Sequence, residues 1–450
     1  MRKGPDGHIP PPFLQPSLLS RRNWTNCPRL SWGQFSEHKL VVGPLDLASP
    51  SASLRDGFRL AESPTMNLLT SWLMLTAWLL ALVECAASSF ATLTDEDLRN
   101  IPSPGDDFDI HNGKLLAPIL IPRVPDTDGS RKVQRHFVDF FRDSLPEWQI
   151  LSQNSTFKTP VSGDKEVPFT NWIFRRDPPW ANVGDVGRLT LVAHYDSLST
   201  LDGFIGAIDS AAPCAMLLHV ARSLDEALTS KWKSMQDSGE DGLEEPKGVQ
   251  ILLLDGEEAF KDWTDTDSIY GARALAADWE SQRYDPMSTY KTPLSSISLF
   301  VLLDLLGNAN PRVPSHFLTT HWAYRSMAEL EKRMQDLGIL EAKPKAPFLP
   351  DADKDVSTFR GSRIGDDHVP FMTRGVDILH LIPDPFPWHL WHKMTDDGEH
   401  LDLPTCRDWS KIVTAFSMEF LELANHIPKR SNVDRLGDVK QGDQKKRSDL

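Results

Sequence analysis

Five short apolar runs, separated by segments with helical spacing, constrain most strongly how this chain folds. The runs are NWIF near residue 171, RLTLVAHYD from 188, GVQILLLDGEE from 248, SLFVLLDLLG from 298 and VDILHLIP from 376. Helical patterns lie between them over 210–228, 270–281 and 321–337. Strands that are apolar on both faces are typical of a sheet covered by helices on both sides. We therefore expect a three-layer α/β/α sandwich with a mixed, largely parallel central sheet.

Two further helices are indicated outside these runs. RKVQRHFVDFFRDSL places Val133, Phe137 and Phe141 at helical spacing and ends at Pro146. The stretch DWSKIVTAFSMEFLELANHI, which begins at Asp408, predicts a last helix. The charged segment 229–247 is predicted to be a surface loop, and the polar tail 428–450 is predicted to be disordered.

Composition excludes several classes of function. The chain carries 48 basic and 63 acidic residues, a formal net charge of −15, so nothing in its overall charge favours a nucleic acid or an anionic membrane as partner. Its four cysteines form no CxxC pair, which argues against a disulfide scaffold and against a thiolate metal site. Any metal must therefore be held by oxygen and nitrogen ligands.

The N-terminal part resembles a secretory signal that begins late. Residues 68–83, LLTSWLMLTAWLLALV, are uncharged and are followed by the small residues CAASSFA. We expect 66–91 to be a signal peptide starting at Met66 and 1–65 to be a non-native or disordered extension; the alternative is a signal anchor with a cytoplasmic tail. Either alternative makes 92–427 one secreted or lumenal domain, without stable membrane insertion if the signal is cleaved. The sequon at Asn154 is compatible with this location.

Acids and histidines follow four successive predicted strands. They are His194 and Asp196, Glu257 and Glu258, Asp304, and finally His389 and His392. Ligands of open α/β sheets bind beyond the carboxyl ends of the strands. A single acid there is an ordinary turn residue, but the repetition favours a metal centre, and zinc is the metal that takes Asp, Glu and His when cysteine is absent.

The neighbouring pair Glu257 and Glu258 indicates a division of labour. Adjacent side chains on an extended backbone point in opposite directions, so the two carboxylates flank a reaction centre more easily than they share one ion. One would bind the metal and the other would transfer protons. The alternative is that both acids only stabilise the N-terminus of a helix.

Long motifs make the chain similar to the glutaminyl-peptide cyclotransferases of the animal and fungal type over about 130–427. They are GAIDSAAPCAMLLHVARSLD (206–225), LLLDGEEAFKDWTDTDSIYGAR (252–273), VLLDLLGNANP (301–311), GDDHVPFMTRGV (365–376) and LHLIPDPFPWHLWHKMTDDGEHLD (379–402). That family shares its fold with the di-zinc aminopeptidases. The resemblance implies an acyltransferase that converts N-terminal glutamine of peptides or proteins to pyroglutamate and releases ammonia.

The resemblance also implies roles for particular residues. One zinc ion per chain would be held by Asp209, Glu258 and His392. Glu257 would be the general acid/base, with Asp304 and Asp366 as the acids hydrogen-bonded to it. A pocket for the glutaminyl side chain would be formed by Trp263, Phe386 and Trp391. From the sequence alone, Asp209 is equally well a helix N-cap, His392 a surface histidine and the aromatics core residues.

The chain departs from the family pattern at three places. Ala193 stands where animal members have a cysteine that bridges to the one matching Cys214, so no such disulfide is expected. Gly365 replaces a glutamine near the pocket, and PFPWHLWH is one residue longer than the corresponding loop. The pocket rim and the substrate preference therefore stay open, while the metal triad is intact.

The sequence is also compatible with two other functions, a di-zinc aminopeptidase and a lumenal binding protein without catalytic activity. A di-zinc aminopeptidase would need five ligands, and the chain has them in His194, Asp209, Glu258, Asp304 and His392. Asp209 would then bridge two ions and Glu257 would activate a water. The aromatics favour the cyclase. A catalytically silent lumenal binding protein is disfavoured by the complete set of ligands and base.

Overall fold

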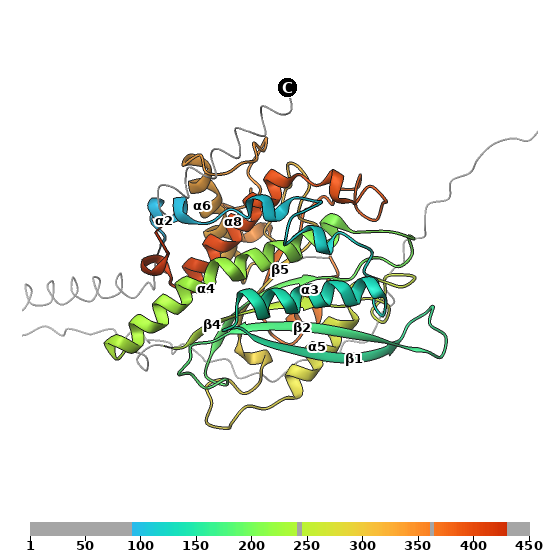
Figure 1. The fold of residues 1–450 in the computed structure, drawn as a ribbon, viewed down its shortest axis with the longest axis horizontal. Helices are drawn as coiled ribbons and strands as arrows, with labels where there is room; N and C mark the ends of the chain where they lie inside the picture. Colours follow the sequence, from blue (N-terminus) through green and yellow to red (C-terminus); the bar gives the residue numbers. More distant parts are fainter. Residues whose placement is uncertain (1–91, 241–244, 361–363, 430–450) are drawn as a thin grey trace, which may run out of the picture. The chain divides into compact units, whose positions relative to one another are not determined.

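The computed structural model describes residues 92–240, 245–360 and 364–429 (Figure 1). Every described residue lies in one compact unit, Leu82–Leu450. The expected extension 1–65, the signal segment 66–91 and nearly all of the tail 428–450 lie outside the described residues. No helix of the described part is long and apolar enough to cross a membrane.

The centre of the described domain is a mixed, six-stranded sheet with the order β1-β2-β4-β3-β5-β6. The strands are β1 (Gln149–Lys158), β2 (Glu166–Arg176), β3 (Gly187–His194), β4 (Lys247–Leu254), β5 (Ile297–Leu303) and β6 (Ile378–Leu381). β3 to β6 are parallel, whereas β1 and β2 are antiparallel to their neighbours. The five apolar runs became β2 to β6, which confirms the predicted sheet.

Helices cover both faces of the sheet, as predicted (Figure 1). The side chains of the central strands alternate between two cores: Leu191 of β3 packs with helices α3, α4, α6 and α8, and Val192 packs with α5 and α7. These helices are α3 (Asp128–Ser144), α4 (Ala212–Ser238), α5 (Tyr270–Ser281), α6 (His321–Asp336), α7 (Val369–Met372) and α8 (Leu403–Phe420); a short α2 (Asp95–Asn100) precedes them.

Helix α3 follows its apolar stripe. Val133, Phe137 and Phe141 are fully buried, and the Phe141 ring stacks on Phe174 of β2 with the two centroids 3.8 Å apart. Thr127 caps the first turn by accepting a hydrogen bond from the backbone N–H of Ser130, and the helix ends at Ser144. The spacing of three aromatic and aliphatic residues thus fixes where the helix lies on the sheet.

The prediction of a surface loop over 229–247 was wrong in its first half. Helix α4 continues to Ser238 and ends at Gly239, which adopts the left-handed conformation common after a helix. Trp232 is buried, with the Arg176 guanidinium 5.1 Å from the centre of its ring. The sequence predicts a loop here because the segment is charged and because Trp232 packs against Arg176 of β2, which is distant in the chain.

Candidate metal and catalytic centre

The polar residues that follow the parallel strands converge at one edge of the sheet. Asp196 follows β3, Glu257 and Glu258 follow β4, Asp304 follows β5, and His392 lies in the loop after β6. The four carboxylates are almost completely buried. Asp209, which stands just before α4, joins them. Acids gathered in this way are costly to bury unless a cation or protons balance them.

Three predicted metal ligands lie together. The ligand atoms of Asp209, Glu258 and His392 are all within 4.8 Å of one another. His392 Nε2 is 3.5 Å from Asp209 Oδ2 and 3.4 Å from Glu258 Oε2. Asp209 Oδ2 and Glu258 Oε1 are buried and accept no hydrogen bond. Two carboxylates, each with a buried oxygen that accepts no hydrogen bond, and one imidazole nitrogen form the donor set that zinc prefers, so the residues fit a zinc ion.

A second group of potential ligands shares Asp209. His194 Nε2 lies 3.1 Å from Asp209 Oδ1 and 3.4 Å from Asp304 Oδ1. Asp304 also accepts a hydrogen bond from the hydroxyl of Ser210. The five residues that a di-zinc aminopeptidase would need are therefore assembled, and their geometry does not by itself separate one metal from two.

The site perturbs its own titrating groups. Burial raises the pKa of Glu257 well above its usual range, and the charges of Glu258 and Asp366 raise it further. Burial and the charge of Asp209 raise the pKa of Glu258 to about 7. The pKa of His392 rises to about 9, against the effect of its own burial, because Glu258 and Asp209 stabilise the cation. All three pKa values are raised, and apart from burial the shared cause is excess negative charge, which a bound divalent cation would neutralise.

Asp196 holds the Glu257–Glu258 pair in place. Its Oδ1 accepts a hydrogen bond from the backbone N–H of Glu257 (3.0 Å) and its Oδ2 accepts one from that of Glu258 (3.1 Å). The same carboxylate lies 3.4 Å from His194 Nδ1. The sequence showed Asp196 at a strand end but assigned it no role. The spacing of His194 and Asp196, on the same side of an extended chain, was the available signal.

Gly256 is required immediately before the pair. Its φ of +73° lies in the left-handed region, and a Cβ atom there would come within 2.4 Å of the Phe169 ring. A larger residue would displace either the ring or the Glu257 backbone.

The loop that carries Asp209 is clamped from two sides. The buried Arg123 guanidinium donates to the carbonyl oxygens of Ile205, Gly206 (3.0 Å) and Asp209 (3.3 Å). Asp396 Oδ1 accepts a hydrogen bond from the backbone N–H of Ile208 (2.7 Å). Sequence reasoning missed Arg123 and Asp396, because both act on backbone groups far away in the chain.

The three predicted pocket aromatics line one cavity with Glu257 and two of the predicted metal ligands, Asp209 and His392. The cavity has a volume of about 320 Å³. The Trp391 ring stacks on His392 with centroids 4.2 Å apart and meets the Phe386 ring edge-on at 5.0 Å. Three apolar lining residues were not predicted, since nothing in the sequence separates them from core residues. The lining consists of Asp209, Glu257, Trp263, Asp304, Leu305, Ile364, Gly365, Ile382, Phe386, Trp391 and His392.

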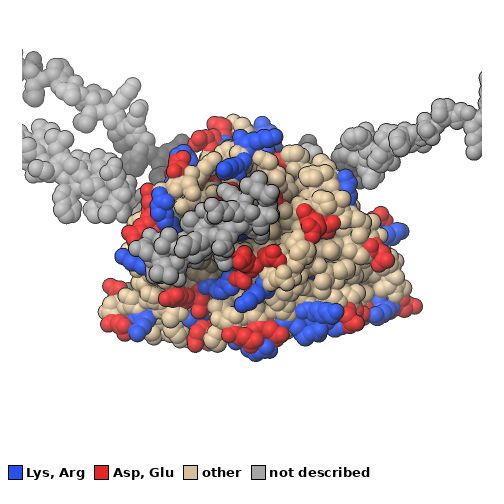
Figure 2. Space-filling view, turned by 45° about the horizontal axis from the view of Figure 1, so that its top comes forward, with Lys and Arg blue, Asp and Glu red and all other residues tan. Residues whose placement is uncertain are grey.

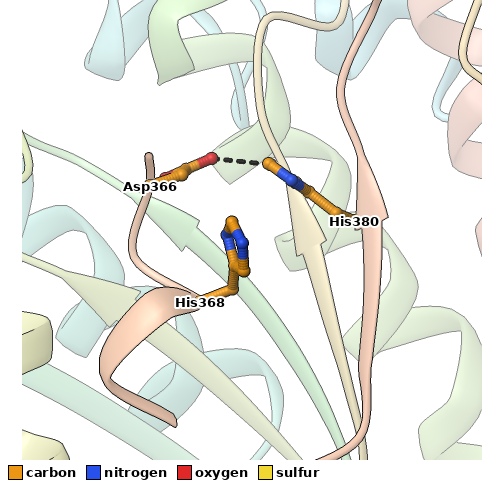
Figure 3. Close-up of side chains that lie close together, drawn as sticks. All are labelled: Asp366, His368 and His380. Atoms are coloured by element: carbon orange, nitrogen blue, oxygen red, sulfur yellow. Dashed lines mark hydrogen bonds and ion pairs between the residues drawn. The ribbon is translucent and has the colours of Figure 1, made fainter. Parts of the chain in front are cut away.

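Asp366 lies outside the cavity lining and pairs with a histidine (Figure 3). His380 Nε2 is 2.7 Å from Asp366 Oδ2, and the His368 ring centroid is 4.5 Å from that of His380. Burial lowers the pKa of His380 to about 4, so its ring is neutral at neutral pH. The side chain of Asp366 also accepts a hydrogen bond from the backbone N–H of Asp367. Within the described residues, Asp366 acts on Glu257 through its charge.

The surface drawn in Figure 2 is mixed in charge. Basic and acidic side chains are interspersed with other residues, and the uncovered part of this face carries no continuous patch of one sign. Charge steering over that part of the face is therefore weak.

Residues 181–417 match Peptidase family M28, so the fold and the site define a member of that family. The glutaminyl-peptide cyclotransferase of Boiga irregularis is 37% identical over 313 residues, which are 68% of this chain and 80% of the relative. That of Bos taurus is 35% identical over 316 residues, 68% and 81% of the two chains. The crystal structure of Macrostomum lignano glutaminyl cyclase superposes with a TM-score of 0.56 at 29% identity, covering 75% of this chain and 93% of the other.

Within the M28 family, the chain therefore belongs to the glutaminyl-peptide cyclotransferases. This membership confirms the resemblance found in the motifs. It also favours the cyclase over the aminopeptidase, which the arrangement of ligands left open.

Proposed function

We propose that the chain cyclises N-terminal glutaminyl residues of peptides and proteins to pyroglutamate and releases ammonia. The observation that carries this proposal is the composition of the cavity: aromatic walls enclose about 320 Å³ that ends on Glu257, Asp209 and His392. Ligand pockets range from about 300 to 1,000 Å³, so this one suits a single side chain better than a peptide segment. The rest of a substrate would lie outside.

The reaction forms a bond between the α-amine nitrogen and the side-chain carboxamide carbon, Cδ, of the same glutamine, and it breaks the bond from that carbon to the amide nitrogen. A zinc ion held by Asp209, Glu258 and His392 would supply Lewis acidity toward the γ-carbonyl oxygen. Glu257 takes a proton from the attacking amine and delivers it to the departing nitrogen. The buried position that raises its pKa makes Glu257 a stronger base than an exposed glutamate.

The aromatic walls hold the side chain for this intramolecular attack. Trp391 and Phe386 meet edge-on and leave a narrow apolar space beside His392. A fixed, folded substrate conformation removes much of the entropic barrier to ring closure. Exclusion of water favours cyclisation over hydrolysis of the amide.

We further infer one zinc ion per chain. Asp304, which a second ion would need, already accepts a hydrogen bond from Ser210 and lies 3.4 Å from His194 Nε2. The His194 pKa is raised well above its usual range, because hydrogen bonds to Asp196, Asp209 and Asp304 outweigh the effect of burial, so these groups already satisfy one another. Two tightly held zinc ions in the purified protein would support the aminopeptidase instead.

The test of the proposed function is a side-by-side assay of two substrate classes. An H-Gln-X peptide should lose ammonia and yield a pyroglutamyl peptide. Leu- and Ala-arylamides should be cleaved little, because their cleavage requires a water nucleophile and the proposed cyclisation does not. Coupled ammonia detection and mass spectrometry measure both. Release of free amino acids from ordinary peptides without pyroglutamate would assign the site to the aminopeptidase.

Trp391→Ala is expected to raise KM for a Gln peptide by about tenfold, since the loss of about 1.4 kcal/mol of binding corresponds to that factor. The Trp391 ring forms one wall of the cavity. The matched control is Trp322→Ala, an exposed tryptophan of α6 away from the cavity, which should leave KM as in the wild type. Zinc content must be measured too, because Trp391 stacks on His392. An unchanged KM with zinc retained would remove Trp391 from the binding site.

We also infer that the chain enters the secretory pathway and that its mature form starts near residues 86–92. Leu93 is buried, and its backbone N–H donates to Glu419 Oε1 (2.9 Å), so the folded domain needs the chain from about that point onward. N-terminal sequencing of the protein from its native host would measure the start. Peptides recovered from 1–65 would support the anchored form instead.

A further inference from the structure

An exposed tryptophan stands beside the cavity. Trp388 is 58% exposed, yet its ring centroid lies 5.0 Å from that of Trp391 and 5.6 Å from that of Phe386. Both of these neighbours line the cavity, whereas Trp388 does not. A large aromatic ring left in solvent next to a binding site marks a contact surface.

The backbone around Trp388 is well anchored. Its N–H donates to the carbonyl oxygen of Phe386 (2.8 Å), and its own carbonyl oxygen accepts from Lys393 Nζ. The backbone N–H groups of Leu390 (2.8 Å) and Trp391 (3.0 Å) both donate to the carbonyl oxygen of Pro387. The ring is therefore presented from a hydrogen-bonded turn, which lowers the entropic cost of using it as a contact.

The mouth of the cavity carries a second exposed tryptophan. Trp263 is 45% exposed and packs so close to Gly365 that a Cβ atom there would lie 3.1 Å from its Nε1. Trp263 lines the cavity itself, while Trp388 lies beyond the wall formed by Phe386 and Trp391. A peptide whose first residue fills the cavity continues outside it, and both tryptophans offer exposed aromatic surface next to the cavity.

We propose that Trp388 forms a subsite for the second residue of the substrate and that this subsite selects aromatic and large aliphatic side chains. The proposal rests on the proposed cyclase function. Flat aromatic surface favours other aromatic rings through stacking and apolar contact, and it offers nothing to a glycine or a charged side chain. Trp388 belongs to the loop PFPWHLWH, which also contains Phe386, Trp391 and His392 of the cavity lining.

The test compares kcat/KM for two peptides that differ only in the second residue, H-Gln-Phe-Ala-NH2 and H-Gln-Gly-Ala-NH2. The wild type should prefer the Phe peptide, and Trp388→Ala should reduce the Phe-to-Gly ratio by about tenfold, mainly by raising KM for the Phe peptide. Trp388→Phe should restore part of the preference. The control variant Trp322→Ala should keep the wild-type ratio.

Other outcomes separate the subsite from the function on which it rests. An equal fall in kcat/KM for both peptides would mean that Trp388 only supports Trp391, and an unchanged ratio would mean that it contacts no substrate; either result overturns the subsite. Failure of the wild type to cyclise either peptide would overturn the proposed function instead. Since the Trp388 ring is mostly in solvent, unfolding of the variant is not expected, and a thermal melt checks this.

Discussion

Glu257→Gln is expected to lower the turnover of a Gln peptide by about 10²–10⁴-fold while the protein keeps its zinc, because proton transfer by a positioned carboxylate supplies about that factor. The substitution preserves the size of the side chain and removes its ability to accept the proton of the α-amine. Glu257 lines the cavity beside the metal ligands, but its neighbour Glu258 is the one whose oxygen faces His392. Steady-state kinetics and metal analysis of the same preparation measure both effects.

The matched control for this change is Glu226→Gln, an exposed glutamate of α4, which should have wild-type turnover. If Glu257→Gln kept full activity, the proton-transfer role of Glu257 would be wrong. If it lost zinc as well as activity, Glu257 would be a metal ligand, and the division of labour between the two neighbouring acids would have to be reversed.

His392→Ala is expected to lose the metal and to lower activity by at least about 100-fold. Removing a group that only orients a metal ligand costs about 10- to 100-fold, and removing the ligand itself costs more. His392 Nε2 faces Asp209 Oδ2 and Glu258 Oε2, and two buried oxygens of these acids, Asp209 Oδ2 and Glu258 Oε1, accept no hydrogen bond. Without the imidazole, two buried carboxylates remain as ligands. Zinc per chain after dialysis, measured by mass spectrometry, reports this loss independently of activity.

His389→Ala is the control that the loop itself provides. His389 is exposed and lies in the same turn, so its replacement should leave zinc content and activity as in the wild type. The sequence alone could not decide between these two histidines. Retention of a full complement of zinc by His392→Ala, or its loss from His389→Ala, would contradict the proposed ligand set.

Most of the fold could be predicted because burial leaves a simple pattern. β2 to β6 and the helices between them appear as apolar runs with the expected periods. β1 was missed because it is an edge strand with exposed, polar residues such as Ser152 and Asn154, which carry no such pattern. The extension of α4 was missed because the contact of Trp232 with Arg176 links residues far apart in the sequence.

The candidate site also contains residues that the sequence predicts and residues that it does not. Its acids and histidines could be found because parallel strands end at one edge, where the sequence places them in order. Arg123 and Asp396 could not be found, since their partners are backbone groups of a distant loop. Geometry also leaves Asp304 with two interpretations, as a ligand of a second metal or as a partner of Ser210. The number of zinc ions in the purified protein would separate them.

The most direct test of the account follows the side-chain nitrogen of the substrate. A peptide whose N-terminal glutamine carries a heavy nitrogen isotope in its amide is incubated with the zinc-loaded protein, and the products are separated by mass spectrometry. Cyclisation predicts labelled ammonia and a pyroglutamyl peptide that is otherwise intact. Labelled free glutamine together with a peptide shortened by one residue would contradict the account and identify a hydrolase.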